Sequence, residues 1–144
     1  MVSKILVATD FSENANRAID FAADLSEKLC ASVTIINVIP NIVPFGMSGA
    51  EIAIVRGENY LSDIKRINEG KIVSIINNIK LKNSSFITSI VKFGNPVQEI
   101  LLTAEDFDIL VIGHRGESNL LDSFTGTTSE RIIHKATLPV IVVP

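Results

Sequence analysis

The sequence has no tryptophan, one tyrosine and one cysteine among its 144 residues. Because a disulfide needs two cysteines, none can form within the chain, and a metal site built on several cysteines is excluded. This cysteine usage is typical of a reducing compartment, so we expect a cytoplasmic protein. The first apolar run, which ends at Asp10, is too short for a signal peptide, and no apolar stretch is long enough to span a bilayer.

The sequence also lacks a large excess of either acidic or basic residues. The chain has 13 basic and 16 acidic residues, well mixed along the sequence, and a net charge of −3. A surface that binds nucleic acid or an anionic membrane needs a basic cluster, so we expect neither partner. Apolar residues make up 47% of the chain, which at this length is enough for one domain with a sizeable core. We therefore expect residues 1–144 to form a single domain.

Strand-like and helix-like patterns alternate along the chain. Short runs rich in Ile and Val predict strands, and apolar residues at helical spacing predict helices between them. The expected strands are residues 5–9, 33–39, 86–91, 109–112 and 140–143, and the expected helices are residues 13–30, 60–79, 96–104 and 129–136. Strands that are apolar on both faces are typical of a doubly wound α/β fold, with a five-stranded parallel sheet covered by helices on both faces. Periodicity alone does not choose between the strand orders 2-1-3-4-5 and 3-2-1-4-5.

Residues 42–55 differ from the rest of the chain. Glycines interrupt this segment and prolines flank or enter it, yet it is rich in apolar residues, unlike a polar linker. Two interpretations stay open. The segment is either a loop or short helix packed at the domain edge, for example at a subunit contact, or a lid over a ligand.

The most informative stretch begins with Gly113-His114-Arg115-Gly116, continues for nine residues and ends with Gly126-Thr127-Thr128. It joins a buried strand to a helix. Glycine lets the backbone approach an anion, and the start of a helix offers unpaired N–H groups, so the stretch suits phosphate. The alternative is a plain helix cap, because Thr127 and Glu130 have the spacing of a capping box. The stretch matches neither the Walker A motif nor the dinucleotide signature.

Gly-x-x-Gly, nine residues and Gly-Thr resembles the nucleotide-binding pattern of the universal stress protein family, which is Gly-x-x-Gly, nine residues and Gly-Ser/Thr. The likeness extends over nearly the whole chain and includes residues 4–12, 38–40, 94–96, 108–113 and 139–143. The resemblance implies the adenine nucleotide α-hydrolase-like fold with strand order 3-2-1-4-5. That order would bring Asp10 and Gly113 to the same crevice.

The resemblance also implies a nucleotide site. Its ligand would be ATP, or ADP or AMP, with Mg²⁺ or Mn²⁺ held by the phosphates. Asp10 has a second interpretation as a cap of the first helix, and Arg115 as a solvated loop residue. The implied binding residues are Ala8, Thr9 and Asp10 at the adenosine end, Val38 against adenine through its backbone, Ile112, Gly113, Arg115 and Gly116 beside ribose and phosphates, and Gly126, Thr127 and Thr128 around the phosphates.

The function implied by the resemblance is that of an ATP-binding universal stress protein, a nucleotide-dependent regulator or sensor in the stress response. No catalytic residue set stands out, so we expect at most slow ATP hydrolysis and no enzyme. Similar proteins form homodimers through the last strand, here Val140–Val143. The alternative is a nucleotide-free interaction or scaffold protein of the same fold, which would act through residues 42–55 or the dimer surface. A hydrolase or nucleotidyl-transfer enzyme on the related fold is a third, weaker alternative.

Overall fold

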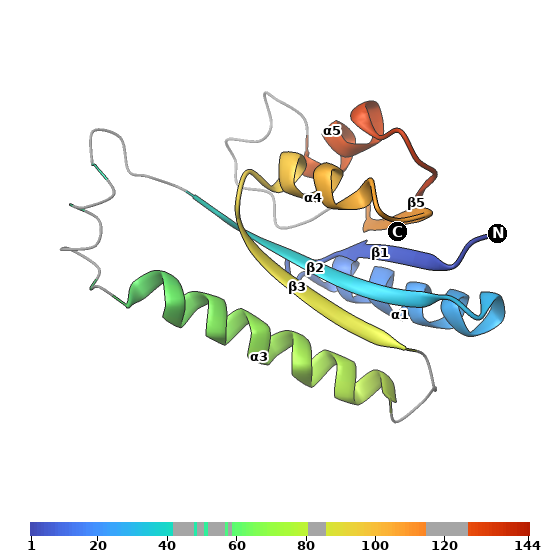
Figure 1. Ribbon diagram of the computed structural model, residues 1–144, viewed down its shortest axis with the longest axis horizontal. Helices are drawn as coiled ribbons and strands as arrows, with labels where there is room; N and C mark the ends of the chain where they lie inside the picture. Colours follow the sequence, from blue (N-terminus) through green and yellow to red (C-terminus); the bar gives the residue numbers. More distant parts are fainter. Residues whose placement is uncertain (42–47, 49–50, 52–56, 58, 81–85, 115–126) are drawn as a thin grey trace.

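Strands and helices alternate along the chain in the computed structural model, which describes residues 1–41, 48, 51, 57, 59–80, 86–114 and 127–144 (Figure 1). The strands are β1 (Lys4–Ala8), β2 (Ser32–Pro40), β3 (Ile87–Gly94), β4 (Ile109–Gly113) and β5 (Val140–Val143). The helices are α1 (Glu13–Leu29), α3 (Tyr60–Lys80), α4 (Pro96–Ala104) and α5 (Thr128–Lys135). Every predicted element is present, and the observed ends differ from the predicted ones by a few residues.

The five strands form one parallel sheet in the order β3-β2-β1-β4-β5. The central strand β1 pairs with β2 on one side and β4 on the other, so that Ile5 lies between Val33 and Ile109. This confirms the order 3-2-1-4-5 and excludes 2-1-3-4-5. The direction of winding reverses between β1 and β4, and in sheets of this kind the carboxyl ends of the strands at the reversal form a crevice.

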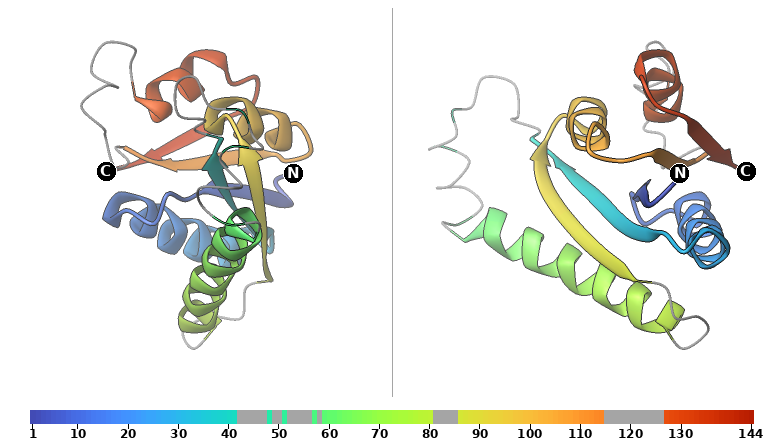
Figure 2. Two further views of the ribbon diagram at one scale, coloured as in Figure 1. Left: turned by 90° about the vertical axis from the view of Figure 1, so that its left-hand side faces the viewer. Right: turned by 45° about the vertical axis from the view of Figure 1, so that its right-hand side comes forward.

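Helices cover both faces of the sheet, as predicted. α1 and α3 lie on one face, and α4 and α5 lie on the other (Figure 2). Successive side chains of a strand point to opposite faces. Ile5 and Val7 of β1 therefore join the core under α1 and α3, which includes Ile72. Leu6 joins the second core, which includes Ile132 of α5. This explains why β1 is a continuous apolar run.

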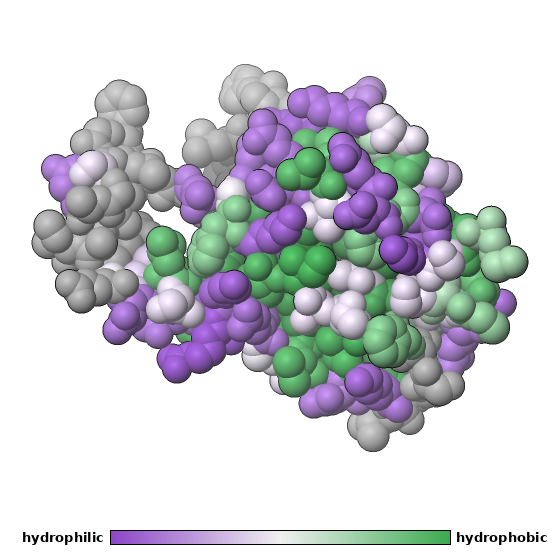
Figure 3. Space-filling model, in the orientation of Figure 1, coloured by the Kyte–Doolittle hydropathy of each residue, from purple (hydrophilic) through white to green (hydrophobic). Residues whose placement is uncertain are grey.

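Apolar surface is grouped on one face of the molecule. In Figure 3 it lies between α3 and α4, in the region that the edge strand β3 crosses in Figure 1. The last five residues of β3, from Ile90 to Gly94, are only partly buried. Among the helices that the structure describes, none is long and apolar enough to cross a membrane. Apart from Ser48 and Glu51, the segment 42–55 lies outside the described residues, and both interpretations of it remain predictions.

Two helix starts have the caps that the sequence predicts. The hydroxyl of Ser12 accepts a hydrogen bond from the backbone N–H of Ala15 at 3.2 Å, which caps α1. The side chain of Asn95 accepts one from the N–H of Gln98 at 3.1 Å, and proline occupies the first position of α4. Such caps satisfy N–H groups that have no partner within the helix. They determine where α1 and α4 begin, and both helices begin at the crevice.

Asp108 ties the start of β4 to the start of β1 at the opposite end of the sheet. One of its carboxylate oxygens accepts hydrogen bonds from the N–H groups of Ser3 at 2.8 Å and Lys4 at 2.9 Å, and from the Ser3 hydroxyl at 3.1 Å. The backbone N–H groups of Ser3 and Lys4, and then the Ser3 hydroxyl, hold the pKa of Asp108 below its ordinary value. The ionised form of this side chain therefore stabilises the fold.

We expect Asp108→Asn to weaken the dependence of stability on pH in the acid range. The folded-state pKa of Asp108 is lowered, so the stability from its ionised form is complete above the unfolded value of about 3.9. That stability is lost as the pH falls through the lower folded-state pKa. Urea unfolding at a series of acid pH values measures the slope, and exposed Asp106→Asn is the matched control. Equal slopes for the wild type and both variants would contradict the expected role of Asp108.

Candidate functional site

A cavity of about 530 Å³ lies at the carboxyl ends of the strands. Its walls come from the ends of β1, β2 and β4, the turn before α1, one side of α3 and the first turns of α4 and α5. The volume is within the range of about 300–1,000 Å³ that is usual for small-molecule sites. The cavity therefore occupies the place where a doubly wound sheet binds its ligands.

The predicted nucleotide-binding residues meet in this cavity wherever the structure describes them. They come from segments far apart in the sequence, and the sheet order brings them together. The residues that line the cavity are Ala8, Thr9, Asp10, Val38, Ile112, Gly113, Thr127 and Thr128. Arg115, Gly116 and Gly126 lie outside the described residues, so their placement remains a prediction.

Thr127 caps α5 and also lines the cavity. Its hydroxyl accepts a hydrogen bond from the N–H of Glu130 at 3.2 Å, and its own N–H donates to the Glu130 carboxylate at 3.2 Å. The predicted capping box is therefore formed. A hydroxyl that accepts one hydrogen bond still has its own proton to donate. The two interpretations of Thr127, cap and phosphate ligand, are thus chemically compatible.

Gly113 lies at a close contact between β4 and α1. A Cβ atom on Gly113 would lie 2.9 Å from the carbonyl carbon and 3.0 Å from the carbonyl oxygen of Asn14. The carbonyl of Gly113 accepts a hydrogen bond from the hydroxyl of Ser129 at 2.9 Å, which joins β4 to the start of α5. Packing against α1 is thus one physical reason for glycine here, besides the predicted approach of a ligand.

The turn between β1 and α1 is held by its own side chains. The hydroxyl of buried Thr9 accepts a hydrogen bond from the N–H of Phe11 at 3.0 Å, and the carboxylate of Asp10 accepts one from the N–H of Ser12 at 2.9 Å. Phe11 has φ 66°, a left-handed conformation that is uncommon for residues other than glycine. The N-cap of α1 is thus Ser12 and not Asp10, whose carboxylate instead holds the turn before the helix and also lines the cavity.

The polar or charged lining residues that sequence reasoning did not assign to the site include Asn37, Asn68, Lys71 and Arg131. The two asparagines left a signal, because each stands at an apolar position. Asn37 interrupts the apolar run of β2, and half-buried Asn68 lies four residues before Ile72, in line with the buried face of α3. The two cations left no comparable signal, because their places depend on how α3 and α5 pack.

The charges of the cavity suit an anion. Among the lining residues that the structure describes, Lys71 and Arg131 are cationic and Asp10 is anionic. α5 adds the partial positive charge of a helix N-terminus. No group of three His, Cys, Asp or Glu side chains that could hold a metal ion occurs within the described residues. Among the described lining residues, Asp10 alone could give a carboxylate oxygen to a cation.

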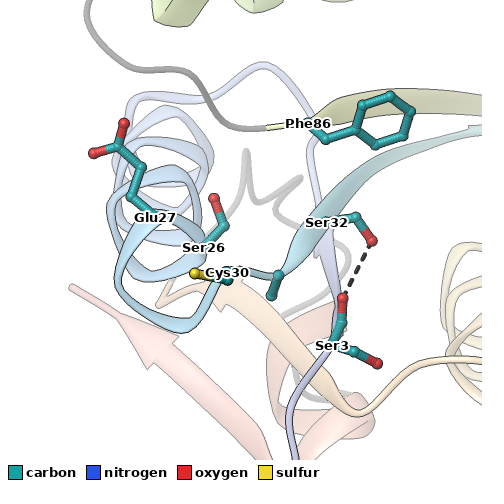
Figure 4. A pocket seen from close by; sticks show the side chains of 7 residues that line it. Ser3, Ser26, Glu27, Cys30, Ser32 and Phe86 are labelled. Carbon is teal, nitrogen blue, oxygen red and sulfur yellow. Dashed lines mark hydrogen bonds between the residues drawn. The ribbon is translucent and has the colours of Figure 1, made fainter.

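A second cavity, of about 630 Å³, lies at the other end of the strands, beside the end of α1 (Figure 4). Its hydroxyl groups are used within the protein. Ser26 donates to the carbonyl of Ala23 at 2.7 Å, and Ser32 donates to the carbonyl of Ser3 at 3.3 Å. The described lining has the carboxylate of Glu27 and no cation. Its position at the amino ends of the strands and its chemistry do not suit a nucleotide.

The strand order and the cavity at its reversal define a doubly wound α/β protein with a ligand crevice between β1 and β4. The family comparison agrees with this class. Residues 1–144 match the universal stress protein family, and the chain belongs to that family. The family resemblance predicted from the glycine pattern is therefore confirmed.

Relatives cover almost the full chain. Universal stress protein MJ0577 from Methanocaldococcus jannaschii is 31% identical over an alignment of 157 positions, which covers 99% of this chain and 95% of the relative. A solved structure of MJ0577 matches with a TM-score of 0.75, 29% identity and coverage of 99% and 96%. A universal stress protein from Archaeoglobus fulgidus in complex with dAMP has a TM-score of 0.58, 20% identity and coverage of 100% and 98%. Another universal stress protein, solved in complex with cAMP, has a TM-score of 0.67, 19% identity and coverage of 99% and 97%.

Proposed function

We propose that this protein binds an adenine nucleotide, ATP first, in the cavity between β1 and β4. It acts as a nucleotide-dependent regulator or sensor in the stress response, in the cytoplasm. The observation that carries this proposal is the convergence of the described motif residues. Thr127 and Thr128 at the start of α5 face the same cavity as Thr9 and Asp10, more than a hundred residues earlier in the chain.

The chemistry of the cavity supports a nucleotide in particular. Its α5 side suits phosphates, because a helix N-terminus, the Thr127 hydroxyl and Arg131 offer hydrogen-bond donors to anionic oxygens. Its β1 side combines a carboxylate at Asp10 with the backbone of β2 at Val38, which suits a ribose and a base. Relatives in complex with cAMP and dAMP favour the same ligand class.

We expect the protein to hydrolyse ATP slowly at most. Asp10 is the only carboxylate in the described lining, so Mg²⁺ or Mn²⁺ would be held mainly by the phosphates. The described lining also has no histidine that could act as a general base beside a serine. The nucleotide then acts as a regulatory ligand, and its hydrolysis is not the function of the protein.

The proposal includes a homodimer through Val140–Val143. β5 is an edge strand of the sheet, and all four of its residues are partly exposed. An edge strand has backbone groups that can pair with a second chain, and a two-fold axis would place two copies of β5 against each other.

The test is to denature the purified protein and search the supernatant for nucleotides by chromatography and mass spectrometry. An equilibrium titration with ATP, ADP and AMP accompanies it. We expect saturable binding with a stoichiometry of about one nucleotide per chain. No co-purified nucleotide together with no saturable binding would refute the proposal and favour the nucleotide-free interaction protein.

Asp10→Ala should weaken ATP binding about tenfold, because it removes a hydrogen-bond acceptor from the adenosine end of the cavity. Titration calorimetry measures the dissociation constant. Asp24→Ala makes the same chemical change at an exposed position of α1 outside the cavity, and we expect wild-type affinity from it. If the two variants bind ATP equally well, Asp10 serves only to hold the turn before α1.

A further inference from the structure

A chain of side-chain amides joins α3 to the end of β1. Asn68 on α3 donates a hydrogen bond from its amide nitrogen to the side-chain oxygen of Asn37 at 2.9 Å. Asn37, which is 4% exposed, donates from its own amide nitrogen to the backbone carbonyl of Thr9 at 2.9 Å. The N–H of Thr9 donates to the carbonyl of Ile36 at 2.9 Å. The backbone of Thr9 is therefore held on both sides.

A second contact joins the same helix to the same turn. The ammonium group of Lys71 lies 5.0 Å from the ring centroid of Phe11, within the range of a cation–π interaction. Lys71 follows Asn68 by three residues, so both side chains project from one side of α3. Phe11 has the left-handed φ of 66°, and such a conformation persists only where surrounding contacts support it.

Asn68 and Lys71, which make these two contacts, are not required by the packing of α3. Asn68 is half-buried and stands one helical turn before Ile72, the first buried residue of α3, where an apolar residue would pack without needing any partner. A buried amide is costly unless it is hydrogen-bonded, so Asn37 is a poor choice for stability alone, and its side-chain oxygen depends on the amide of Asn68 for a partner. Their bonds end on the carbonyl of Thr9, immediately before Asp10, and all of these residues line the cavity.

We propose that Asn68, acting through Asn37, and Lys71, acting through Phe11, are positioning residues for the adenosine end of the nucleotide site. This inference rests on the proposed function. Asn68 and Lys71 hold the backbone of Thr9, Asp10 and Phe11 in the conformation that receives the ligand. A turn that is already ordered loses less conformational freedom on binding, and this raises affinity.

The test uses Asn68→Ala and Lys71→Met in the full chain, with Asn77→Ala as the matched control. Asn77 lies on the same helix, is exposed and does not line the cavity. ATP affinity is measured by titration. Amide hydrogen exchange without ligand is followed at Thr9 and Phe11 in the turn, and at Val7 and Leu110 in the core.

We expect Asn68→Ala and Lys71→Met each to weaken ATP binding about fivefold and to speed exchange at Thr9 and Phe11, with Val7 and Leu110 unchanged. Asn77→Ala should match the wild type in both measurements. Unchanged affinity would overturn the inference, and so would faster exchange at turn and core alike, which marks general loosening. A wild-type protein that binds no ATP contradicts the proposed function instead, so the two failures are distinguishable.

Discussion

Replacing Gly113 with alanine is expected to lower the free energy of unfolding by about 1–3 kcal/mol. The added Cβ would lie 2.9 Å from the carbonyl carbon of Asn14, 3.0 Å from its oxygen and 3.1 Å from the backbone nitrogen of Ala15. All three atoms belong to the backbone of the first turn of α1, so no side-chain rotation can relieve the contact. Either β4 or α1 must move, and both carry part of the core.

Gly70→Ala is the matched control for this prediction. Gly70 lies within α3, and a Cβ there would meet no atom within 4 Å. Alanine favours a helix over glycine by about 0.5–1 kcal/mol, so this variant should be more stable than the wild type. Urea unfolding of the three proteins gives the comparison. A Gly113→Ala protein as stable as the wild type would show that β4 and α1 are not packed as closely as described.

Gly126→Val is expected to weaken ATP binding about 100-fold or more, equivalent to about 2.8 kcal/mol, with little change in stability. Gly126 directly precedes Thr127, whose hydroxyl and helix end face the cavity. In the proposed site the glycine pattern puts Gly126 against the phosphates, so a valine side chain would compete with them for space. Titration with ATP measures the effect, and thermal unfolding without nucleotide tests whether the fold is intact.

The same substitution at Gly70 controls for the valine itself. Gly70 lies on α3 outside the cavity, so Gly70→Val should bind ATP with wild-type affinity and keep the helix stable, because valine favours a helix at least as well as glycine. Gly116→Val, in the other half of the motif, should resemble Gly126→Val. Normal ATP binding by both motif variants would mean that the phosphates lie elsewhere.

Most of the fold could be predicted because burial leaves a plain pattern in a chain of this kind. Residues 5–8 of β1 and 109–112 of β4 are all apolar, because each strand packs against helices on both faces. Caps at Ser12, Asn95 and Thr127 mark helix starts through a residue type and a spacing. Strand order had no such local signal, because both orders considered bury the same strand faces. The family resemblance supplied it.

The candidate site could be predicted in part, for a related reason. Residues at strand ends and in the glycine pattern were identifiable, because parallel strands place their carboxyl ends at one edge. Lys71 and Arg131 reach the cavity only through the packing of α3 and α5, which periodicity does not describe. Asn37 and Asn68 were detectable as polar residues at apolar positions, and their meaning required the hydrogen bonds that join them.

The central place of β1 has a consequence for synthesis on the ribosome. β1 is made first, yet its neighbour β4 follows about a hundred residues later, with Ile5 opposite Ile109. Until β4 emerges, one edge of β1 has no strand to pair with, and exposed strand edges favour association between chains. The same delay applies to the crevice, since its two sides lie on β1 and β4. A nucleotide could bind only to chains in which β4 has paired with β1, and its binding would stabilise that complete sheet.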